Sequence, residues 1–436
     1  MSWLTTLPND TWLRNARVPA ATLAAPAPGP VDFEGLVRLD LRLAAGRIAA
    51  LAPAGSATEG VDLADGQVWP CFVDGHTHLD KTGIWPRHRN VSGDHPGAIE
   101  AVKQDRLAHW NEGDLAPRME FALRCAHAHG TAAIRTHLDC YGQAAAQSWA
   151  VFRRLREAWA GRVDLQAVSL CTIQFLDGED GVLLANLAAE SGGLLGFTST
   201  GVPTDDALRA RVDRVFALAE ERGLDLDLHL DESGDPAQAA LREVALTALR
   251  RGFKGRIQVG HVCSLSVQPQ AEATETIRLC REAGITAIVL PMCNMYLQGR
   301  TPGRTPNWRG VTQVHELRAG GVPLSFASDN VHDPFYCYGD YDMLEVFREA
   351  TRICQLDVPF GDWPASIGAT PAAACGFAGR GLIGLGASAD LVLFRARSMT
   401  ELLSRPQADR VVVRQGRVSA AVAPDWRELD ALVGAP

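Results

Sequence analysis

Two histidines directly after a short apolar segment are the first feature of this sequence that could do chemistry. Residues 68–73 (VWPCFV) predict a buried strand, and His76 and His78 follow within the sequence DGHTH. Side chains at positions i and i+2 of a strand point to the same face, so the two imidazoles would project side by side. The pair could share one divalent cation. Two histidines that alternate by chance in a loop explain this motif, taken alone, about equally well.

Further polar residues of metal-binding and acid–base types recur at the ends of later predicted strands. In chain order they are Arg135, Thr136, His137 and Asp139; Gln174; His229 and Glu232; His261; and Asp329 and Asn330. We assign no role to His88, His95, His109, His127, His129 and His315, and the role of His332 stays open. Three histidines with one aspartate would suit Zn²⁺ or Fe²⁺, with a water of pKa roughly 7 in the open position.

The middle of the chain alternates between predicted strands and predicted helices. The strands are predicted at residues 68–73, 132–136, 165–170, 194–197, 224–230, 257–260, 287–290 and 322–327. Helices with apolar residues at three-and-four spacing are predicted at residues 205–222, 236–251 and 271–283. This α/β pattern predicts a (β/α)₈ TIM-like barrel, whose reactive groups lie at the C-terminal ends of the strands. An open doubly wound sheet is the alternative, because βα repeats alone do not prove closure.

The two ends of the chain are predicted to contain strands and turns, without the alternating helices of the middle. Short strands are predicted at residues 37–43, 47–51, 389–394 and 409–413, with a turn at Gln415 and Gly416. We therefore predict a small composite β-sandwich domain built from residues 1–65 and 385–436, and a barrel domain spanning residues 66–384.

Composition excludes several classes of partner. The 436 residues carry 42 basic and 51 acidic side chains, a formal charge of −9, without Lys/Arg clusters. This balance argues against a nucleic-acid or anionic-membrane partner. No apolar segment approaches the roughly 18 residues of a membrane span, and the first residues do not resemble a signal peptide. Ten scattered cysteines without a CxxC pair indicate a reducing, cytoplasmic location. We expect a homo-oligomer.

The motifs together resemble the amidohydrolase superfamily, in its cytosine-deaminase-like branch. The resemblance rests on FVDGHTHLDKT, on HLDE at 229–232, on GH at 260–261 and on the segment around SFASDNVHDPF. It implies the metal ligands His76, His78, His229 and Asp329, a proton-shuttling carboxylate at Glu232, and His261 beside the reactive water. It also implies that Asp329 takes part in proton transfer and that Gln174 and Asn330 hold the substrate ring.

One metal ion is expected rather than two. A bridged two-metal site often uses a modified lysine on the fourth strand, and residues 165–174 and 194–200 contain no lysine. The cofactor is therefore predicted to be a single Zn²⁺ or Fe²⁺.

Two residues depart from the cytosine deaminases of this branch. Lys81 stands where they usually have threonine, and Asn330 where they usually have a second aspartate. Both residues resemble the s-triazine (isopropylammelide) hydrolases. Lys81 could bind an oxo or carboxylate group of the substrate, or form a salt bridge with Asp80 or a neighbouring loop.

The resemblance implies a metal-dependent hydrolytic deaminase that releases ammonia from an amino-substituted N-heterocycle. Candidate substrates are a cytosine-like pyrimidine, a pterin or a related oxo-aminoheterocycle, and plain cytosine is expected to be a poor one. The alternative is a C–N hydrolase acting on an s-triazine or cyclic amide with the same mononuclear site. A non-catalytic metal-binding protein is a third, weaker reading, because Glu232 and His261 accompany the full ligand set.

Overall fold

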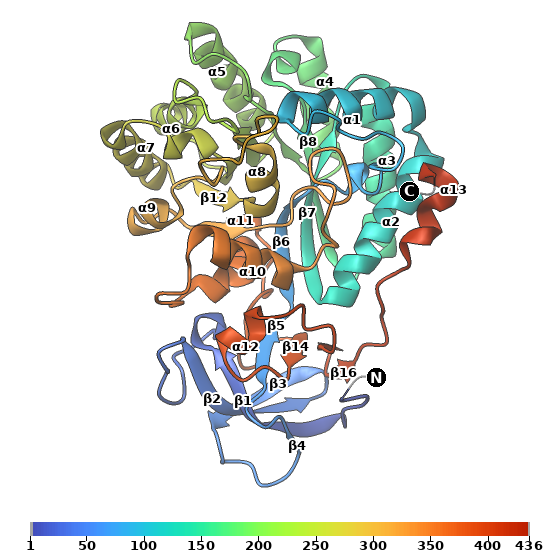
Figure 1. The fold of residues 1–436 in the computed structure, drawn as a ribbon, viewed down its shortest axis with the longest axis vertical. Helices are drawn as coiled ribbons and strands as arrows, with labels where there is room; N and C mark the ends of the chain where they lie inside the picture. Colours follow the sequence, from blue (N-terminus) through green and yellow to red (C-terminus); the bar gives the residue numbers. More distant parts are fainter. Residues whose placement is uncertain (1–2, 435–436) are drawn as a thin grey trace. The chain divides into compact units, whose positions relative to one another are not determined.

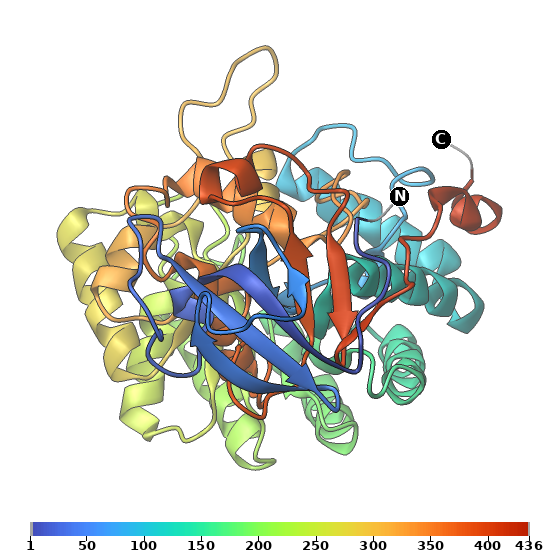
Figure 2. The ribbon, with the colours of Figure 1, turned by 90° about the horizontal axis from the view of Figure 1, so that it is seen from below.

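The computed structural model describes residues 3–434 and contains two eight-stranded sheets. The first sheet joins strands from both ends of the chain, as Figure 2 shows by its blue and red arrows. Its strands are β1 (Asp10–Pro19), β2 (Leu36–Ala44), β3 (Arg47–Pro53), β4 (Val61–Asp62), β5 (Gln67–Pro70), β14 (Leu391–Phe394), β15 (Val411–Arg414) and β16 (Arg417–Val418). The spatial order is β16-β15-β14-β5-β1-β2-β3, with β4 also paired to β1. The predicted sheet from both termini is thereby confirmed.

A single apolar cluster supports this first sheet. Residues from β1, β2, β14 and β15 alternate inward and are fully buried, among them Leu13, Leu39, Leu391 and Val413. The long antiparallel pairing of β1 with β2 supplies much of the sheet's register. Burying one face of each strand in this way fixes the register, because a one-residue slip would expose every inward side chain.

The second sheet is the barrel. Its strands are β6 (Phe72–Thr77), β7 (Thr131–Asp139), β8 (Asp164–Leu170), β9 (Leu194–Leu195), β10 (Leu226–Leu230), β11 (Ile257–His261), β12 (Thr286–Val289) and β13 (Leu324–Phe326). Neighbouring strands follow chain order, and the pairs from β8 to β13 are parallel. A parallel bridge between Thr77 and Asp329 joins the last strand region to the first. The sheet closes, which confirms the (β/α)₈ barrel and excludes the open doubly wound sheet.

Helices follow the barrel strands in the chain (Figure 1). They are α1 (His95–His109), α2 (Glu112–His129), α3 (Gln143–Ala158), α4 (Glu179–Glu190), α5 (Asp206–Glu220), α6 (Ala240–Arg251), α7 (Gln270–Glu282), α8 (Pro291–Leu297), α9 (Val314–Ala319) and α10 (Met343–Cys354). Shorter helices α11 (Ala369–Cys375), α12 (Met399–Leu403) and α13 (Asp430–Val433) come later. The three helices predicted from periodicity are present: α5 and α6 are slightly shorter than predicted, and α7 is shifted by one residue toward the N-terminus. Among the described helices, none is long and apolar enough to cross a membrane.

The predicted strand at residues 68–73 was wrong in one respect. The segment contains two successive strands, because β5 ends at Pro70 and β6 begins at Phe72. β5 pairs with β14 in the first sheet, whereas β6 is the first strand of the barrel. Every residue of both strands is buried, so the apolar pattern alone could not show where one sheet ends and the other begins.

The chain divides into two compact units. One contains residues 1–74, 124–133 and 341–423, and the other contains residues 75–123, 134–340 and 424–436. The domain boundaries predicted at residues 65/66 and 384/385 stay predictions. All the predicted site residues belong to the second unit.

Candidate active site

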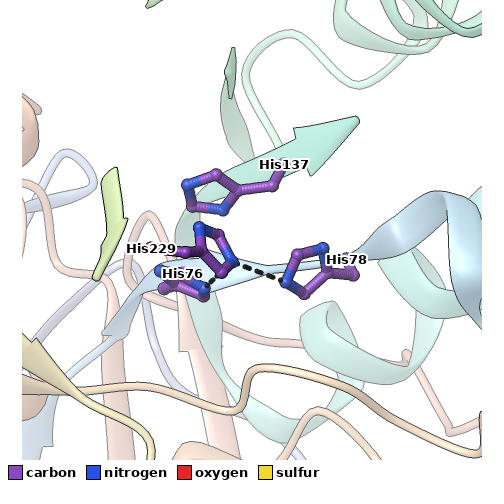
Figure 3. A group of neighbouring side chains, drawn as sticks. All are labelled: His76, His78, His137 and His229. Carbon is purple, nitrogen blue, oxygen red and sulfur yellow. Dashed lines mark hydrogen bonds between the residues drawn. The ribbon is translucent and has the colours of Figure 1, made fainter. Parts of the chain in front are cut away.

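Four histidines gather at the C-terminal ends of the barrel strands, as Figure 3 shows. His76 lies in β6, His78 directly follows it, His137 lies in β7 and His229 lies in β10. Nε2 of His229 is 3.1 Å from Nε2 of His76 and 3.2 Å from Nε2 of His78. Asp329 approaches from the end of β13, and its Oδ1 lies 3.2 Å from Nε2 of His78 and 3.5 Å from Nε2 of His76. The sequence-predicted ligand atoms therefore converge on one point.

This convergence fits a divalent metal ion. Burial lowers the pKa of His76, His78 and His229 well below the ordinary value, so all three rings are neutral at pH 7. Nε2 of His229 faces two other Nε2 atoms and can donate a proton to only one of them. Donor atoms about 2.0–2.2 Å from one ion would lie roughly 3–3.5 Å apart, which matches the separations found. The four residues His76, His78, His229 and Asp329 therefore form a candidate metal centre.

Several strands end in a strained backbone at this centre. Asp231, His261 and Asp329 have φ angles of 51°, 69° and 61°, in the left-handed region that non-glycine residues rarely adopt. Such strain is found where the surrounding structure fixes a side chain for function. Here the positive φ angle at Asp329 belongs to a residue whose carboxylate is completely buried beside the histidines.

Gly260 makes room for the first ligand. A Cβ atom at Gly260 would lie 3.0 Å from Cε1 and 3.3 Å from Nδ1 of His76, closer than ordinary van der Waals contact. The glycine before His261 therefore lets the His76 ring approach the backbone of β11 closely. In the GH motif, the glycine is required by packing against His76, and the histidine has a predicted chemical role.

His137 belongs to a buried polar network next to the metal centre. Its ring centroid is 4.1 Å from that of His76, and its Nε2 lies 3.3 Å from Oδ1 of Asp227. The other carboxylate oxygen of Asp227 accepts hydrogen bonds of 2.8 Å from both Arg135 and Gln258. His137, whose role the sequence left open, packs against the ligands and extends the histidine cluster toward β7.

Glu232 is held from two sides. Its Oε2 lies 3.1 Å from Nε2 of His95, and its Oε1 lies 3.4 Å from both Nδ2 of Asn294 and Nδ1 of His261. Burial raises the pKa of Glu232, but the charge and hydrogen bond of His95, whose own pKa Glu232 raises, act in the opposite direction, and the net pKa lies below the ordinary value. Glu232 is therefore a buried carboxylate that is ionised at neutral pH and can accept hydrogen bonds through both oxygens.

The orientation of His261 is set by Asn294. Nδ2 of Asn294 lies 2.9 Å from Nδ1 of His261 and also faces Oε1 of Glu232, which identifies this end of the amide as the donor. Nδ1 of His261 is thus an acceptor, and the proton of the neutral ring lies on Nε2. Burial lowers the pKa of His261 to about 4, so the ring is neutral at pH 7. Nε2 is buried and has no hydrogen-bond partner among the described residues.

A cavity of about 790 Å³ opens onto these groups. Its inner wall contains His78, His229, Glu232, His261 and Asp329. Its outer wall is mainly apolar and comes from α1 and from the loop around Tyr141. The outer residues include Ile99, Val102, Leu107, Trp110 and Tyr141. Cavities of this size commonly enclose small organic ligands.

Lys81 lines the cavity and is also paired. Its Nζ lies 3.0 Å from Oδ1 of Asp139 and 3.2 Å from Nδ1 of His78, and it lies over the ring of Phe335. Oδ2 of Asp139 accepts a hydrogen bond of 2.8 Å from Arg106. The salt bridge considered from the sequence exists, with Asp139 as the partner rather than Asp80.

The two remaining predicted substrate residues are placed differently. Asn330 lines the cavity, and its Nδ2 donates a hydrogen bond of 2.6 Å to Oδ2 of Asp333. Gln174 is exposed and does not line the cavity, which corrects its predicted place there. The chain after β8 turns into a short 3₁₀ helix that buries Ile173 and Leu176 and thereby directs Gln174 outward. Thr172 lines the cavity instead.

Sequence reasoning missed two partners of Glu232. Asn294 follows the seventh barrel strand, so the same strand-end rule could have found it. His95 opens α1 after a long loop, and no local pattern indicated that it would reach the site. His332, by contrast, lies off the site and stacks on Trp426 with ring centroids 4.3 Å apart.

Comparison with known proteins agrees with this site. Residues 111–420 match the amidohydrolase family. The chain is 48% identical over 427 residues to a pterin deaminase from Rhizobium rhizogenes (strain K84 / ATCC BAA-868), covering 97% of each chain. A 5-methylcytosine deaminase from Klebsiella pneumoniae has a similar fold, with 24% identity, a TM-score of 0.78, and coverage of 95% of this chain and 98% of that chain. An N-isopropylammelide isopropylaminohydrolase from Burkholderia multivorans is 26% identical with a TM-score of 0.73, with coverage of 95% and 98%.

The chain therefore belongs to the amidohydrolase family. It is an enzyme that acts on carbon–nitrogen bonds other than peptide bonds. The resemblance stated from the motifs is confirmed, and so is the prediction of a metal-dependent hydrolytic deaminase acting on a nitrogen heterocycle.

Proposed function

We propose that the substrate is a pterin or a closely related two-ring oxo-aminoheterocycle, from which the enzyme hydrolyses the exocyclic amino group as ammonia. The observation that carries this proposal is the 48% identity, over 97% of both chains, to a pterin deaminase. The cavity of about 790 Å³ supports it, because the space extends well beyond what a single pyrimidine ring would fill.

We propose that His76, His78, His229 and Asp329 hold one divalent ion, Zn²⁺ or Fe²⁺. Imidazole nitrogens together with one carboxylate suit either metal. When bound, the ion would supply Lewis acidity that makes water nucleophilic near neutral pH.

Proton transfer falls to the residues beside this centre. Glu232 is the proposed shuttle, which accepts a proton from the attacking water and delivers it to the ring nitrogen next to the reacting carbon. His261 directs its Nε2–H into the site, where it can donate a hydrogen bond to oxygen as negative charge develops. Asp329 or Glu232 then takes up the second proton of the attacking water and passes it to the amino group, which leaves as ammonia while the carbon–oxygen double bond forms.

Lys81 and Asp139 offer a complementary pair of groups to the ring. The ammonium of Lys81 can donate to a ring oxo oxygen, while the carboxylate of Asp139 can accept from a neighbouring ring N–H. The oxo-amide edge of a pterin has this donor and acceptor side by side. Asn330 is proposed to face the ring as a third polar contact, since it also lines the cavity.

Ammonia release measured across a panel of rings tests the proposal. We expect pterin to give the highest kcat/KM, with cytosine and ammelide lower by at least roughly tenfold. An enzyme most active on ammelide, or on an N-alkylated triazine with release of the amine, would favour the C–N hydrolase alternative. Wild type and Glu232→Gln are assayed together, so that a contaminating deaminase is recognised by equal rates.

We also propose that the enzyme works in the cytoplasm. All ten cysteines are free thiols, and nine of them are buried, as suits a reducing compartment. The homo-oligomer expected from the sequence stays a prediction.

A further inference from the structure

His95 links α1 to the acid–base carboxylate. It is the first residue of the helix, and its Nε2 lies 3.1 Å from Oε2 of Glu232. The imidazole packs edge-on against Phe335, with ring centroids 5.5 Å apart, and lines the cavity. Its side chain is 15% exposed, whereas that of Glu232 is 5% exposed. His95 therefore stands between the buried carboxylate and the open part of the cavity.

The two oxygens of Glu232 depend on different parts of the barrel. Oε1 accepts a hydrogen bond of 3.4 Å from Nδ2 of Asn294 on α8, the helix that follows β12 of the barrel. Oε2 faces only His95 among the partners found within the described residues. The carboxylate plane is thus fixed at one oxygen by the barrel and at the other by α1. Removing His95 would leave one oxygen of a buried carboxylate without its donor, which is costly and invites rotation.

The start of α1 is itself tied down near this contact. Asn90 donates hydrogen bonds from its Nδ2 to the carbonyl oxygens of Asp94 (2.9 Å) and Pro334 (3.1 Å). Its Oδ1 accepts a hydrogen bond of 2.9 Å from the backbone N–H of Gly93. The Asp94 side chain then caps the helix by accepting from the N–H of Gly97 at 3.0 Å. These bonds hold His95 at a fixed point over the site.

We propose that His95 is a positioning residue for Glu232, whose imidazole N–H holds the carboxylate in the orientation from which it exchanges protons with water and the substrate ring. This inference rests on the proposed proton-transfer role of Glu232. α1 therefore contributes to the reaction as well as to the wall of the cavity. The hydrogen bonds of Asn90 hold the start of α1 in place, and only in this position of α1 does His95 hold the second oxygen of Glu232.

The direct test is a double-mutant cycle of His95→Ala and Glu232→Gln, measured on the best substrate of the ring panel. We expect His95→Ala to lower kcat by at least about tenfold with a smaller change in KM, because one contact of a general acid–base group is lost. In the Glu232→Gln background, the same substitution should change kcat by less than about twofold, since the group it positions has already lost its function. An equal loss in both backgrounds would overturn the proposal and assign His95 to the folding of α1.

Two further variants separate chemistry from packing. His95→Gln keeps an N–H donor of similar reach and should recover most of the lost kcat. His109→Ala removes an exposed histidine from the other end of the same helix and should leave kcat unchanged within about twofold. Metal content should stay at the wild-type level in every variant. Failure of His95→Gln to recover more activity than His95→Ala would contradict the proposed hydrogen bond.

A measurement without substrate keeps the inference separate from the substrate assignment. In a crystal structure of His95→Ala, we expect the Glu232 side chain to leave its wild-type rotamer or to occupy two orientations. An unchanged, singly ordered Glu232 would overturn the positioning role, whatever ring the enzyme deaminates. A wild-type enzyme that deaminates another ring of the panel would refute the pterin proposal alone.

Discussion

Nδ2 of Asn294 lies 2.9 Å from Nδ1 of His261, and this contact decides which nitrogen of the histidine carries the proton. Because the amide donates, the remaining N–H of His261 lies on Nε2 and points toward the site. A residue on α8 thus sets the tautomer of a residue at the end of β11.

Replacing Asn294 by aspartate should reverse this tautomer. A carboxylate would accept a proton from Nδ1, leaving Nε2 without the hydrogen that stabilises developing charge. We expect kcat to fall by about 10²–10³-fold, the usual cost of one such donor, with metal content unchanged. Steady-state kinetics with elemental analysis check this. Full activity in Asn294→Asp would show that His261 does not act as a donor through Nε2.

The metal centre should bind one divalent ion per chain. A chelator should abolish ammonia release, and adding back Zn²⁺ or Fe²⁺ should restore it and raise the melting temperature, because the ion binds only the folded protein. His229→Ala should lose the ion, whereas His315→Ala, on α9, should keep it. Two ions per active chain, or wild-type metal content in His229→Ala, would refute the mononuclear site.

Glu232→Gln should keep the metal and lose most of its turnover. The amide preserves the size of the side chain but cannot carry a proton between water and ring nitrogen. We expect kcat to fall by roughly 10²–10⁴-fold. A rate close to that of wild type would reduce Glu232 to a support for neighbouring side chains.

Lys81→Thr tests the proposed recognition of the oxo edge. Losing a buried hydrogen bond from a charged group costs about 1.5–3 kcal/mol, which corresponds to roughly 10–150-fold in kcat/KM for pterin. Cytosine should be a poor substrate of the wild type. Lys103→Thr, at an exposed position of the same cavity, is the matched control and should change kcat/KM for unsubstituted pterin little. If cytosine is the best substrate and Lys81→Thr leaves the ranking unchanged, Lys81 does not select the ring.

A buried ion pair away from the site should govern part of the acid stability. Asp342 accepts hydrogen bonds of 2.6 and 2.5 Å from Arg410 and caps α10 through the N–H of Leu344. Burial raises the pKa of Asp342, but Arg410 outweighs it and the net pKa lies below the ordinary value. Stability from this group is therefore complete above the ordinary pKa near 4 and is lost as the pH falls through the lower, folded-state value.

Arg410→Met should accordingly destabilise the protein at neutral pH and move acid unfolding to higher pH. Breaking one side of a buried pair typically costs about 3–5 kcal/mol. Arg397→Met, in the exposed pair with Glu401, is the control and should leave the free energy of unfolding nearly unchanged, because solvent screens the pair. Denaturant unfolding at pH 7 and at pH 4 measures both effects. Equal stabilities for the two variants would contradict the assignment.

The sequence by itself determined the barrel and the strand-end residues from which the candidate metal centre is built. The alternation of side chains along a strand and the meeting of parallel strand ends at one edge are local rules. They place His76, His78, His229 and Asp329 among the polar residues at one end of the barrel, and the family resemblance then singled out these four as ligands. Glu232 and His261 are strand-end residues too, and their predicted roles also came from the resemblance.

Tertiary structure alone decided which groups surround these residues. His95 reaches Glu232 from a helix 137 residues earlier in the chain, and Asp139 rather than Asp80 pairs with Lys81. Gln174 turns outward because Ile173 and Leu176 take the buried positions. Such contacts depend on the conformations of long loops over the barrel. No repeating pattern of apolar and polar residues in the sequence predicts those conformations. The positions of strand ends are fixed by the regular hydrogen bonding of the sheet. The positions of side chains that reach the site from loops are fixed only by the packing of the whole unit.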